Sequence, residues 1–221
     1  FDTTKGQQVS VGLNSLFTEI IWWYPANSDF NNKAVSYNYA ESQGVAGGVW
    51  ALSTESRTSW MDSKVYEKPY ATKFDTTGTG SFPTILGESG LGQTKYFQHE
   101  VGTDQRNEDG SVTTITSSLQ SYDFDLQGEE GTASRFVSVS RFLPDFKTIA
   151  GNATVTLAVK DFPSSTESSS THSPFTVTSS TTKIDTRARG RFVNVKIANT
   201  AANESWRYGT LALDVKPDGG R

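Results

Sequence analysis

Three arginines at alternate positions, Arg187, Arg189 and Arg191 in the string TRARGR, form a local run of cations in a chain of 221 residues whose formal net charge is −4. Residues 183–207 contain six Lys or Arg against two Asp or Glu, so this segment has a net charge of +4 and the rest of the chain has −8. A guanidinium group binds carboxylates and phosphates through paired hydrogen bonds. A chain with 20 basic and 24 acidic residues is not a general nucleic-acid coat. We therefore expect these arginines to form an interface with an acidic protein surface or to pair within the chain, and contact with DNA stays open as the alternative.

Side chains suited to nucleophilic or acid–base catalysis are few. The chain has two histidines, His99 and His172, and no cysteine. His172 lies in a Ser/Thr-rich stretch with nothing to orient it, and His99 is best explained as a strand residue with one satisfied nitrogen. The string GESGLG at 87–92 lacks the spacing of a nucleophile elbow and predicts a turn. We therefore expect no Ser-His-Asp site and no enzymatic activity.

The acidic loop TDQRNEDGSVTTIT invites comparison with a calcium site. Setting Gly110 sixth in an EF-hand loop puts Gln105 first and Thr116 twelfth, where that site needs Asp and Glu. A hairpin turn at Asp109 and Gly110 is favoured, and a non-helical calcium loop stays open. Carboxylates for glycoside hydrolysis would come from Glu88, Glu100, Asp123 and Asp125. Their separation cannot be read from sequence, and we expect no metal and no cofactor.

Two adjacent tryptophans, Trp22 and Trp23 in IIWWYP, could form a sugar-stacking platform together with Trp60. Core packing is favoured, because an aromatic residue on a strand buries a large apolar area. Neighbouring residues of a strand point to opposite faces. We therefore predict that one of Trp22 and Trp23 lies in the core and the other at an interface between subunits or domains.

Alternation of apolar and polar residues dominates wherever a pattern is visible. The strings FVSVSRF, TVTLAVK, RFVNVKI and TLALDV predict half-buried strands, and no stretch has helical spacing. The predicted core positions are Val137, Val139, Val155, Leu157, Val159, Val193, Val195, Ile197, Leu211, Leu213 and Val215. Turn-forming strings separate the strands, among them PANSD, DTTGTGS, NEDGS, GEEG and KPDGG. The sequence therefore predicts an all-β sandwich, barrel or propeller.

The arginine run continues directly into the strand RFVNVKI. In one continuous strand the three arginines would share the face of Val193, so either they extend beyond the rim of the core or the strand turns at Gly190. Asp185 and Asp214 are the carboxylates that we consider for pairing within the chain.

The chain changes character near Ser117. Residues 1–117 hold four of the five tryptophans and long Gly-rich loops, whereas residues 118–221 alternate more regularly. A Ser/Thr-rich stretch at 163–182 predicts a solvated loop followed by a Thr-rich strand. The longest apolar run, residues 20–24, is far shorter than the ~20 residues of a membrane-spanning helix, so we expect no membrane partner.

Several long strings resemble one family. LFTEIIWWYPANSDFNNKAVSYNYAE, GVWALSTESRTSWMDSKVYEKPYA, YFQHEVGTDQRNEDGS and the ending KIDTRARGRFVNVKIANTAANESWRYGTLALDVKPDGGR are similar to the C-terminal part of the tail nozzle proteins of short-tailed bacteriophages, also called tail tubular protein B or hub proteins. The resemblance spans nearly the whole chain and is firmest over residues 13–74 and 183–221. Residues 75–92 and 163–173 match no part of the family pattern.

The resemblance implies a virion protein of the phage tail without catalysis. Members of this family form a ring, usually a homohexamer, below the portal adaptor ring, and their β-propellers surround the channel through which the genome is retained and ejected. Residues 1–117 would then be a propeller-type portion begun upstream, which fits a chain that starts with Phe, and residues 118–221 a β-sandwich-like domain or blade. Double-stranded DNA would pass without tight binding, since each neutralised phosphate adds affinity through counterion release.

Two other functions stay open at this stage. One is a polysaccharide-binding module or depolymerase of a phage tail that uses Trp22, Trp23 and Trp60 with nearby carboxylates. The other is an adhesion or secreted β-sandwich protein that forms no ring.

Overall fold

The structure, a computed structural model, describes residues 3–75, 93–107, 109–125, 135–162 and 170–220. These residues form nineteen strands and one short 3-10 helix, η1 (Thr3–Gln8), so the all-β prediction is confirmed. The chain divides into two compact units, Phe1–Val101 and Gly102–Arg221. Among the described residues no sheet closes on itself. The predicted turns at GESGLG and GEEG, and the candidate carboxylate Glu88, lie outside the described residues.

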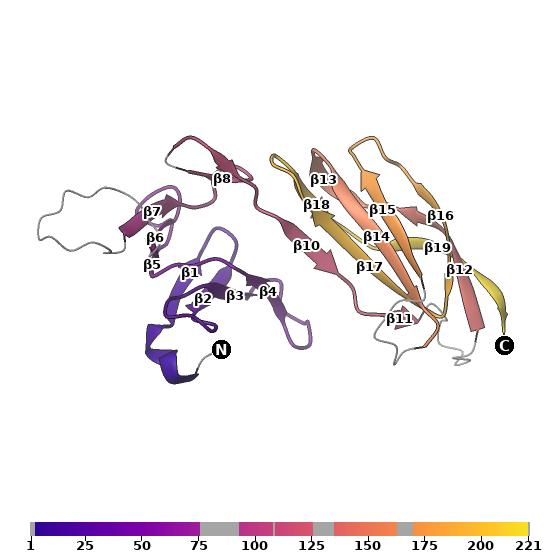
Figure 1. Cartoon of the computed structure of the whole chain (residues 1–221), viewed down its shortest axis with the longest axis horizontal. Coiled ribbons are helices and arrows are strands. Elements are labelled where there is room, and N and C mark those ends of the chain that lie inside the picture. Colours follow the sequence, from indigo (N-terminus) through magenta and orange to yellow (C-terminus); the bar gives the residue numbers. More distant parts are fainter. Residues whose placement is uncertain (1–2, 76–92, 108, 126–134, 163–169, 221) are drawn as a thin grey trace, which may run out of the picture. The chain divides into compact units, whose positions relative to one another are not determined.

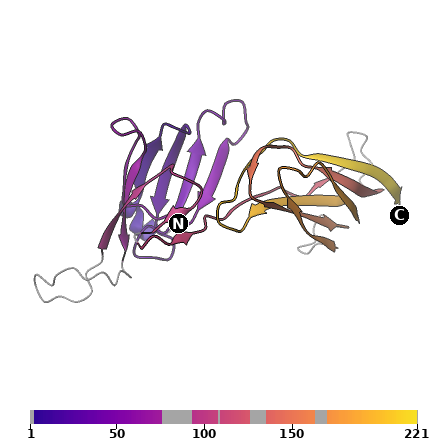
Figure 2. The same cartoon turned by 90° about the horizontal axis from the view of Figure 1, so that it is seen from above.

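Unit 1 is built around a four-stranded antiparallel sheet. Its strands are β1 (Ser10–Asn14), β2 (Glu19–Tyr24), β3 (Lys33–Asn38) and β4 (Val49–Ser53), and each pairs with the next one in the chain. Figure 2 shows these indigo and purple strands standing edge to edge. The side chain of Asn32 closes the loop that contains the predicted turn PANSD. It accepts a hydrogen bond from the N–H of Ala26 at 2.8 Å and donates one to the carbonyl of Ala26 at 3.0 Å. Every pair of strands in this sheet thus consists of strands that are consecutive in the sequence.

The two faces of the β1–β4 sheet differ in chemistry. Two cross-strand rows occupy one face, which we name the apolar face: Val11, Trp22, Val35 and Leu52 in one row, Leu13, Ile20, Tyr37 and Trp50 in the other. The opposite or inner face holds the buried residues Ile21, Trp23 and Ala34, which pack with Trp60. The period of two in these strands therefore gives one face with two apolar rows, beside which Lys33 lies at the start of β3, and one face that forms the core of unit 1.

A second sheet of unit 1 contains β5 (Ser59–Met61), β6 (Tyr70–Asp75) and β7 (Gln93–Gln98) in that order. Strand β5 contacts β1, where Trp60 packs over Gly12. A Cβ atom at residue 12 would lie 2.6 Å from Trp60 Cδ1, so this close approach requires glycine.

Unit 2 begins with a small hairpin of β8 (Gln105–Arg106) and β9 (Val112–Thr113). Gly110 has φ +81° and donates its N–H to the carbonyl of Asn107 at 3.0 Å. The carboxylate of Asp109 accepts from the N–H of Ser111 at 2.9 Å and from its hydroxyl at 2.6 Å. The turn predicted at Asp109 and Gly110 is confirmed.

The rest of unit 2 consists of three sheets (Figure 1). The largest contains β10 (Ser117–Gln120), β17 (Phe192–Asn199), β14 (Ala153–Lys160) and β15 (Ser170–Val177) in that order, with β11 (Phe124–Asp125) also on β17. A smaller sheet has the order β16 (Ile184–Gly190), β12 (Arg135–Leu143), β19 (Ala212–Gly220). The third pairs β13 (Phe146–Ala150) with β18 (Ser205–Tyr208).

One hydrophobic core joins the larger and the smaller sheets. Its most buried residues come from β12, β14, β15, β16 and β17, and the residues predicted there from alternation are confirmed: Val137, Val139, Val155, Leu157, Val159, Val193, Val195 and Ile197. Leu211 and Leu213 are partly buried against this core. The prediction for Val215 was wrong, because its side chain is 38% exposed.

The end of the chain differs from its predicted form. Val215 pairs with the buried Val139 on β12, yet it lies on an edge strand with no further strand beside it among the described residues. The predicted turn KPDGG was also wrong, because these residues continue β19, and Pro217 pairs with Val137. An edge strand tolerates proline because no neighbour needs its missing N–H.

Candidate functional site

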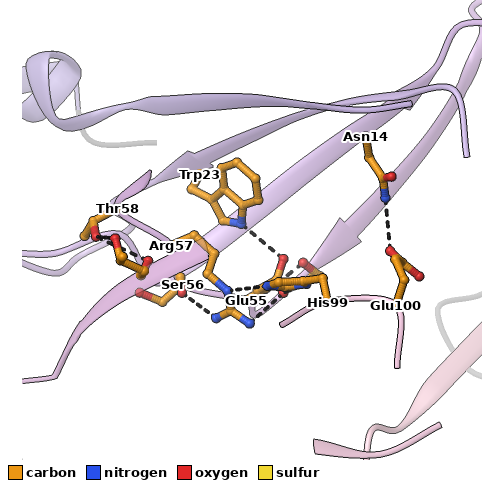
Figure 3. Close-up of polar contacts among 10 residues, drawn as sticks. Asn14, Trp23, Glu55, Ser56, Arg57, Thr58, His99 and Glu100 are labelled. Atoms are coloured by element: carbon orange, nitrogen blue, oxygen red, sulfur yellow. Dashed lines mark hydrogen bonds and ion pairs between the residues drawn. The ribbon is translucent and has the colours of Figure 1, made fainter. Parts of the chain in front are cut away.

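A polar network in unit 1 centres on Glu55, in the segment between β4 and β5 (Figure 3). One of its carboxylate oxygens lies 3.0 Å from Arg57 Nη2 and 3.6 Å from His99 Nδ1. The other accepts a hydrogen bond from the indole N–H of Trp23 at 3.1 Å. The buried guanidinium of Arg57 also lies over the ring of Phe97, 4.3 Å from its centroid. Glu55 and Arg57 therefore neutralise each other inside the unit.

His99 is held as a neutral imidazole. Its Nε2 accepts a hydrogen bond from Arg57 Nε at 2.8 Å, so the ring proton is on Nδ1, facing Glu55. Burial, reinforced by the charge of Arg57 and opposed by that of Glu55, lowers the pKa of His99 to about 4. His99 has a structural role, as interpreted, but it follows β7 instead of lying in a strand, and both of its nitrogens have partners.

Aromatic rings fix this network to the inner face of the sheet. The ring of Trp60 lies 5.3 Å from that of Trp23 and 4.7 Å from that of His99, measured between centroids. The indole N–H of Trp60 donates to the carbonyl of Leu13 at 2.9 Å. These contacts connect β1, β2 and β5 with the residue that follows β7.

A cavity of about 200 Å³ lies beside the network, lined by the inner face and by Glu19, Glu55, His99 and Glu100. The side-chain amide of Asn14 donates to Glu100 at 3.0 Å. Burial, followed by the charge of Glu100, raises the pKa of Glu19. The cavity is therefore rich in acceptors and unfavourable to a further negative charge.

This arrangement does not resemble a catalytic constellation. The two nitrogens of His99 are engaged and no hydroxyl or thiol nucleophile is bonded to them. In the described ranges, no three His, Asp or Glu side chains are grouped so as to hold a metal ion. The network instead ties the β4–β5 segment to β7 and to Trp23 of the sheet.

The arginine run ends where the chain passes from one sheet to another, with Arg187 and Arg189 in β16 and Arg191 between β16 and β17. In β16 the residues alternate, with Thr186, Ala188 and Gly190 buried and Arg187 and Arg189 exposed. The chain then leaves the smaller sheet and enters the larger one as β17. A Cβ atom at residue 190 would lie 2.8 Å from Val159 Cβ, so only glycine fits at the crossing. Of the two alternatives that we considered, the turn at Gly190 is confirmed.

Two of the arginines bond within unit 2. Arg189 Nε lies 2.6 Å from a carboxylate oxygen of Asp218, and its guanidinium lies 4.3 Å from the centroid of Phe136. Arg191 donates its backbone N–H to the carbonyl of Lys160 at 2.9 Å, and its Nη1 lies 3.4 Å from the carbonyl of Asp161. Pairing within the chain is thus observed for Arg189.

The prediction that Asp185 or Asp214 pairs with the arginine run was wrong. Asp185 and Asp214 bond instead to Arg141 on the central strand β12, at 3.1 and 3.4 Å. Asp185 also lies 3.0 Å from Lys183 Nζ. Arg187 forms no ion pair with any residue that the structure describes.

The adjacent tryptophans point to opposite faces, as predicted. Trp23 is fully buried on the inner face. Trp22 is half-buried on the apolar face, where its ring stacks 6.1 Å from that of Trp50. Of the pair, Trp22 is therefore the residue available for an interface with a subunit or domain, and that contact stays a prediction.

The remaining candidates lie in different elements of the two units. His172 lies in strand β15, so the expectation that nothing orients it was wrong. Glu100 is in unit 1, whereas Asp123 is in unit 2, 2.6 Å from Lys160 Nζ, and Asp125 lies in β11. Asp123 is therefore neutralised by a lysine of its own unit.

Neither a scan against models of known protein families nor a search of curated proteins finds a match for this chain. Within the described residues there is no helix with the length and apolar character needed to cross a bilayer.

Sequence reasoning missed the partners of His99. Glu55 and Arg57 lie more than 40 residues before it, and no spacing rule connects segments so far apart. It also missed Thr186, the buried residue between Asp185 and Arg187. Period-two alternation of this strand would have indicated that Thr186 faces inward.

Proposed function

We propose that this chain is a structural virion protein of a phage tail nozzle. In this role it assembles as a ring, a homohexamer by family resemblance, below the portal adaptor ring and around the channel for double-stranded DNA. It retains the genome and guides its ejection without catalysis.

The topology of unit 1 supports a propeller-type portion. A propeller blade is a four-stranded antiparallel sheet whose strands follow each other in the chain. The β1–β4 sheet has this order, and β5, β6 and β7 follow as three strands of a second meander. In our proposal these are successive blades of a propeller, and the two core-sharing sheets of unit 2 form a sandwich-like domain.

The observation that carries the proposal is the apolar face of the β1–β4 sheet. Its two rows of eight residues contain no charged residue, and Val11, Leu13, Trp50 and Leu52 are 59%, 37%, 54% and 79% exposed. A contiguous apolar surface of this kind marks an interaction site. Covering each large side chain stabilises an assembly by about 1.5–3 kcal/mol. A subunit whose task is to pack against neighbours needs such a surface.

The polysaccharide alternative receives less support. It needs Trp22, Trp23 and Trp60 to offer free ring faces, but Trp23 is fully buried and Trp60 packs between Trp23 and His99. Glu100, one of its carboxylates, is bonded to Asn14. Trp23, Trp60 and Glu100 thus serve the interior of unit 1.

The charge distribution suits a conduit through which DNA slides. Tight binding to a channel would follow if many cations each neutralised a phosphate. Here Arg141 and Arg189 are paired with carboxylates of the same unit, in a chain of net charge −4. Such pairing reduces the positive charge available to a passing duplex.

Negative-stain imaging of the purified protein tests the proposal. We expect ring-shaped particles, and we expect Leu52→Lys to abolish them by placing a charge on the apolar face. Val49→Lys is the matched control, because Val49 is 39% exposed on the same strand but belongs to the other face. A wild type that remains monomeric would refute the proposal. Release of reducing sugar from a host polysaccharide would favour the depolymerase instead.

A further inference from the structure

A second hollow lies at the edge of unit 2, between the edge strands of its two largest sheets. Strand β15 ends the larger sheet and β16 ends the smaller one, and the two strands contact each other (Figure 1). The hollow has a volume of about 350 Å³ and is lined by His172, Phe175, Asp185, Thr186 and Arg187.

Two of the residues that line this hollow have a buried polar atom with no hydrogen-bond partner among the described residues. Thr186 is 8% exposed, and its hydroxyl oxygen is one of these two atoms. His172 Nε2, contributed by the opposite strand, is likewise buried and without a partner. Native proteins leave few buried polar groups unsatisfied, and each one calls for an explanation. Because His172 and Thr186 line the same hollow, one ligand there could form hydrogen bonds with both.

The cation beside these atoms is also unused. Arg187 is exposed, and it has no ion pair within the described part of the chain, whereas Arg189 on the same face pairs with Asp218 at 2.6 Å. Asp185 also lines the hollow, but its carboxylate is bonded to Arg141 and Lys183. On the edge strand β16 Thr186 is buried and Arg187 is exposed, so the hydroxyl and the imidazole nitrogen lie on the buried side of the hollow and the guanidinium on its solvent side. Asp185, the acid among the lining residues, is already neutralised.

We propose that this hollow binds a carboxylate group, supplied by an Asp or Glu side chain of a protein partner. A carboxylate accepts up to four hydrogen bonds, which suits the two parallel N–H groups of Arg187 together with the Thr186 hydroxyl and an N–H of His172. The inference deepens the proposed assembly role, because it specifies the chemistry of one contact, although the site itself is argued from the hollow alone.

A nucleic-acid phosphate fits this site less well. Binding to a duplex rests on several cations spaced along the backbone. Arg187 is the one Lys or Arg among the described residues that line the hollow, and the nearby Arg141, Lys183 and Arg189 are each paired with a carboxylate. One guanidinium with neighbouring hydroxyl and imidazole groups matches a single carboxylate better than a polyanion.

NMR titration of the purified protein with sodium acetate, against sodium chloride at equal ionic strength, tests this site. We expect saturable shifts of the His172 ring and of the Thr186 amide. Arg187→Gln and Thr186→Val should each weaken acetate binding by about tenfold, the effect of losing one hydrogen bond to a charged group. Thr186→Ser should retain binding, because it keeps the hydroxyl. Arg189→Gln is the matched control and should leave the affinity unchanged.

Three results would overturn the inference. The first is a shift with acetate that does not saturate or that is equal in Arg187→Gln and in Arg189→Gln. The second is unchanged acetate binding in Thr186→Val whose thermal melt matches wild type. The third is binding of a short DNA duplex that Arg187→Gln weakens while acetate has no effect. Ring formation by imaging is an independent readout, so rings without acetate binding refute this inference alone, and acetate binding without rings refutes the proposed function alone.

Discussion

Protonation of His99 should destabilise unit 1 as the pH falls. The folded protein holds this imidazole neutral, with a pKa of about 4 against 6.5 for an ordinary histidine. Because the unfolded chain binds the proton more readily, the contribution is fully present above pH 6.5 and is lost as the pH falls from 6.5 towards 4. The side chain is 14% exposed, so solvent screening is small. The difference in pKa corresponds to at most about 3 kcal/mol, or about 1.4 kcal/mol per pH unit within that window.

Urea unfolding at pH 7, 6 and 5 measures this effect. Tryptophan fluorescence reports mainly on unit 1, which holds four of the five tryptophans. The comparison is with His99→Gln, whose amide oxygen can accept from Arg57 and whose N–H can donate to Glu55, but which does not titrate. Glu19, whose pKa is raised, acts in the opposite direction and is common to both proteins, so the difference between the two slopes isolates His99.

Equal slopes of unfolding free energy against pH in the wild type and in His99→Gln would refute this reasoning. So would an NMR titration in which the His99 ring of the folded protein has a pKa near 6.5. Either result would mean that Arg57 Nε does not occupy the imidazole lone pair in solution.

Three further outcomes follow from packing and are measured by urea or thermal unfolding. Leu157→Ala, at a fully buried position, should cost about 2–5 kcal/mol, whereas Val215→Ala on the exposed edge should cost under about 1 kcal/mol; equal costs would contradict the burial pattern. Gly12→Ala should destabilise unit 1 by about 1–3 kcal/mol, since its Cβ overlaps the ring of Trp60, and a neutral result would contradict that contact. Arg189→Gln should change stability by at most about 1 kcal/mol, because both partners of its ion pair are about half exposed; a larger loss would show an additional role for Arg189.

Local alternation predicted the core of unit 2 well. Val155, Leu157 and Val159 alternate with polar residues and are all fully buried in β14. The same rule holds for Val193 on β17, because both strands lie inside a sheet that another sheet covers. A period of two predicts which residues of a strand share a face. In β14 and β17 that face is packed in the core of unit 2.

The rule failed at the sheet edge. The pattern of β19 resembles that of β14, yet Val215 is exposed because β19 has a paired strand on one side only among the described residues. The turn-like string KPDGG became part of the same strand. Sequence gives the face of a residue but not the position of its strand in a sheet, and that position depends on pairing with remote segments.

The sequence predicts single features of the candidate site but not how its residues come together. That Trp22 and Trp23 point in opposite directions follows from neighbouring positions on a strand. The bonding of His99 to Arg57 depends on how β7 lies beside the segment before β5, which no local pattern encodes. The hollow beside Arg187 likewise needs two strands from different sheets to meet at their edges.

The strand orders of the two units have a consequence for folding kinetics. In the β1–β4 sheet each strand pairs with its neighbour in the chain, so little loop-closure entropy opposes its formation. In unit 2, Arg141 of β12 reaches partners 44 and 73 residues away, on β16 and β19. Proteins dominated by such distant pairings fold in about milliseconds to seconds. During synthesis the meander of unit 1 is therefore complete before the last strand of the smaller sheet has been made.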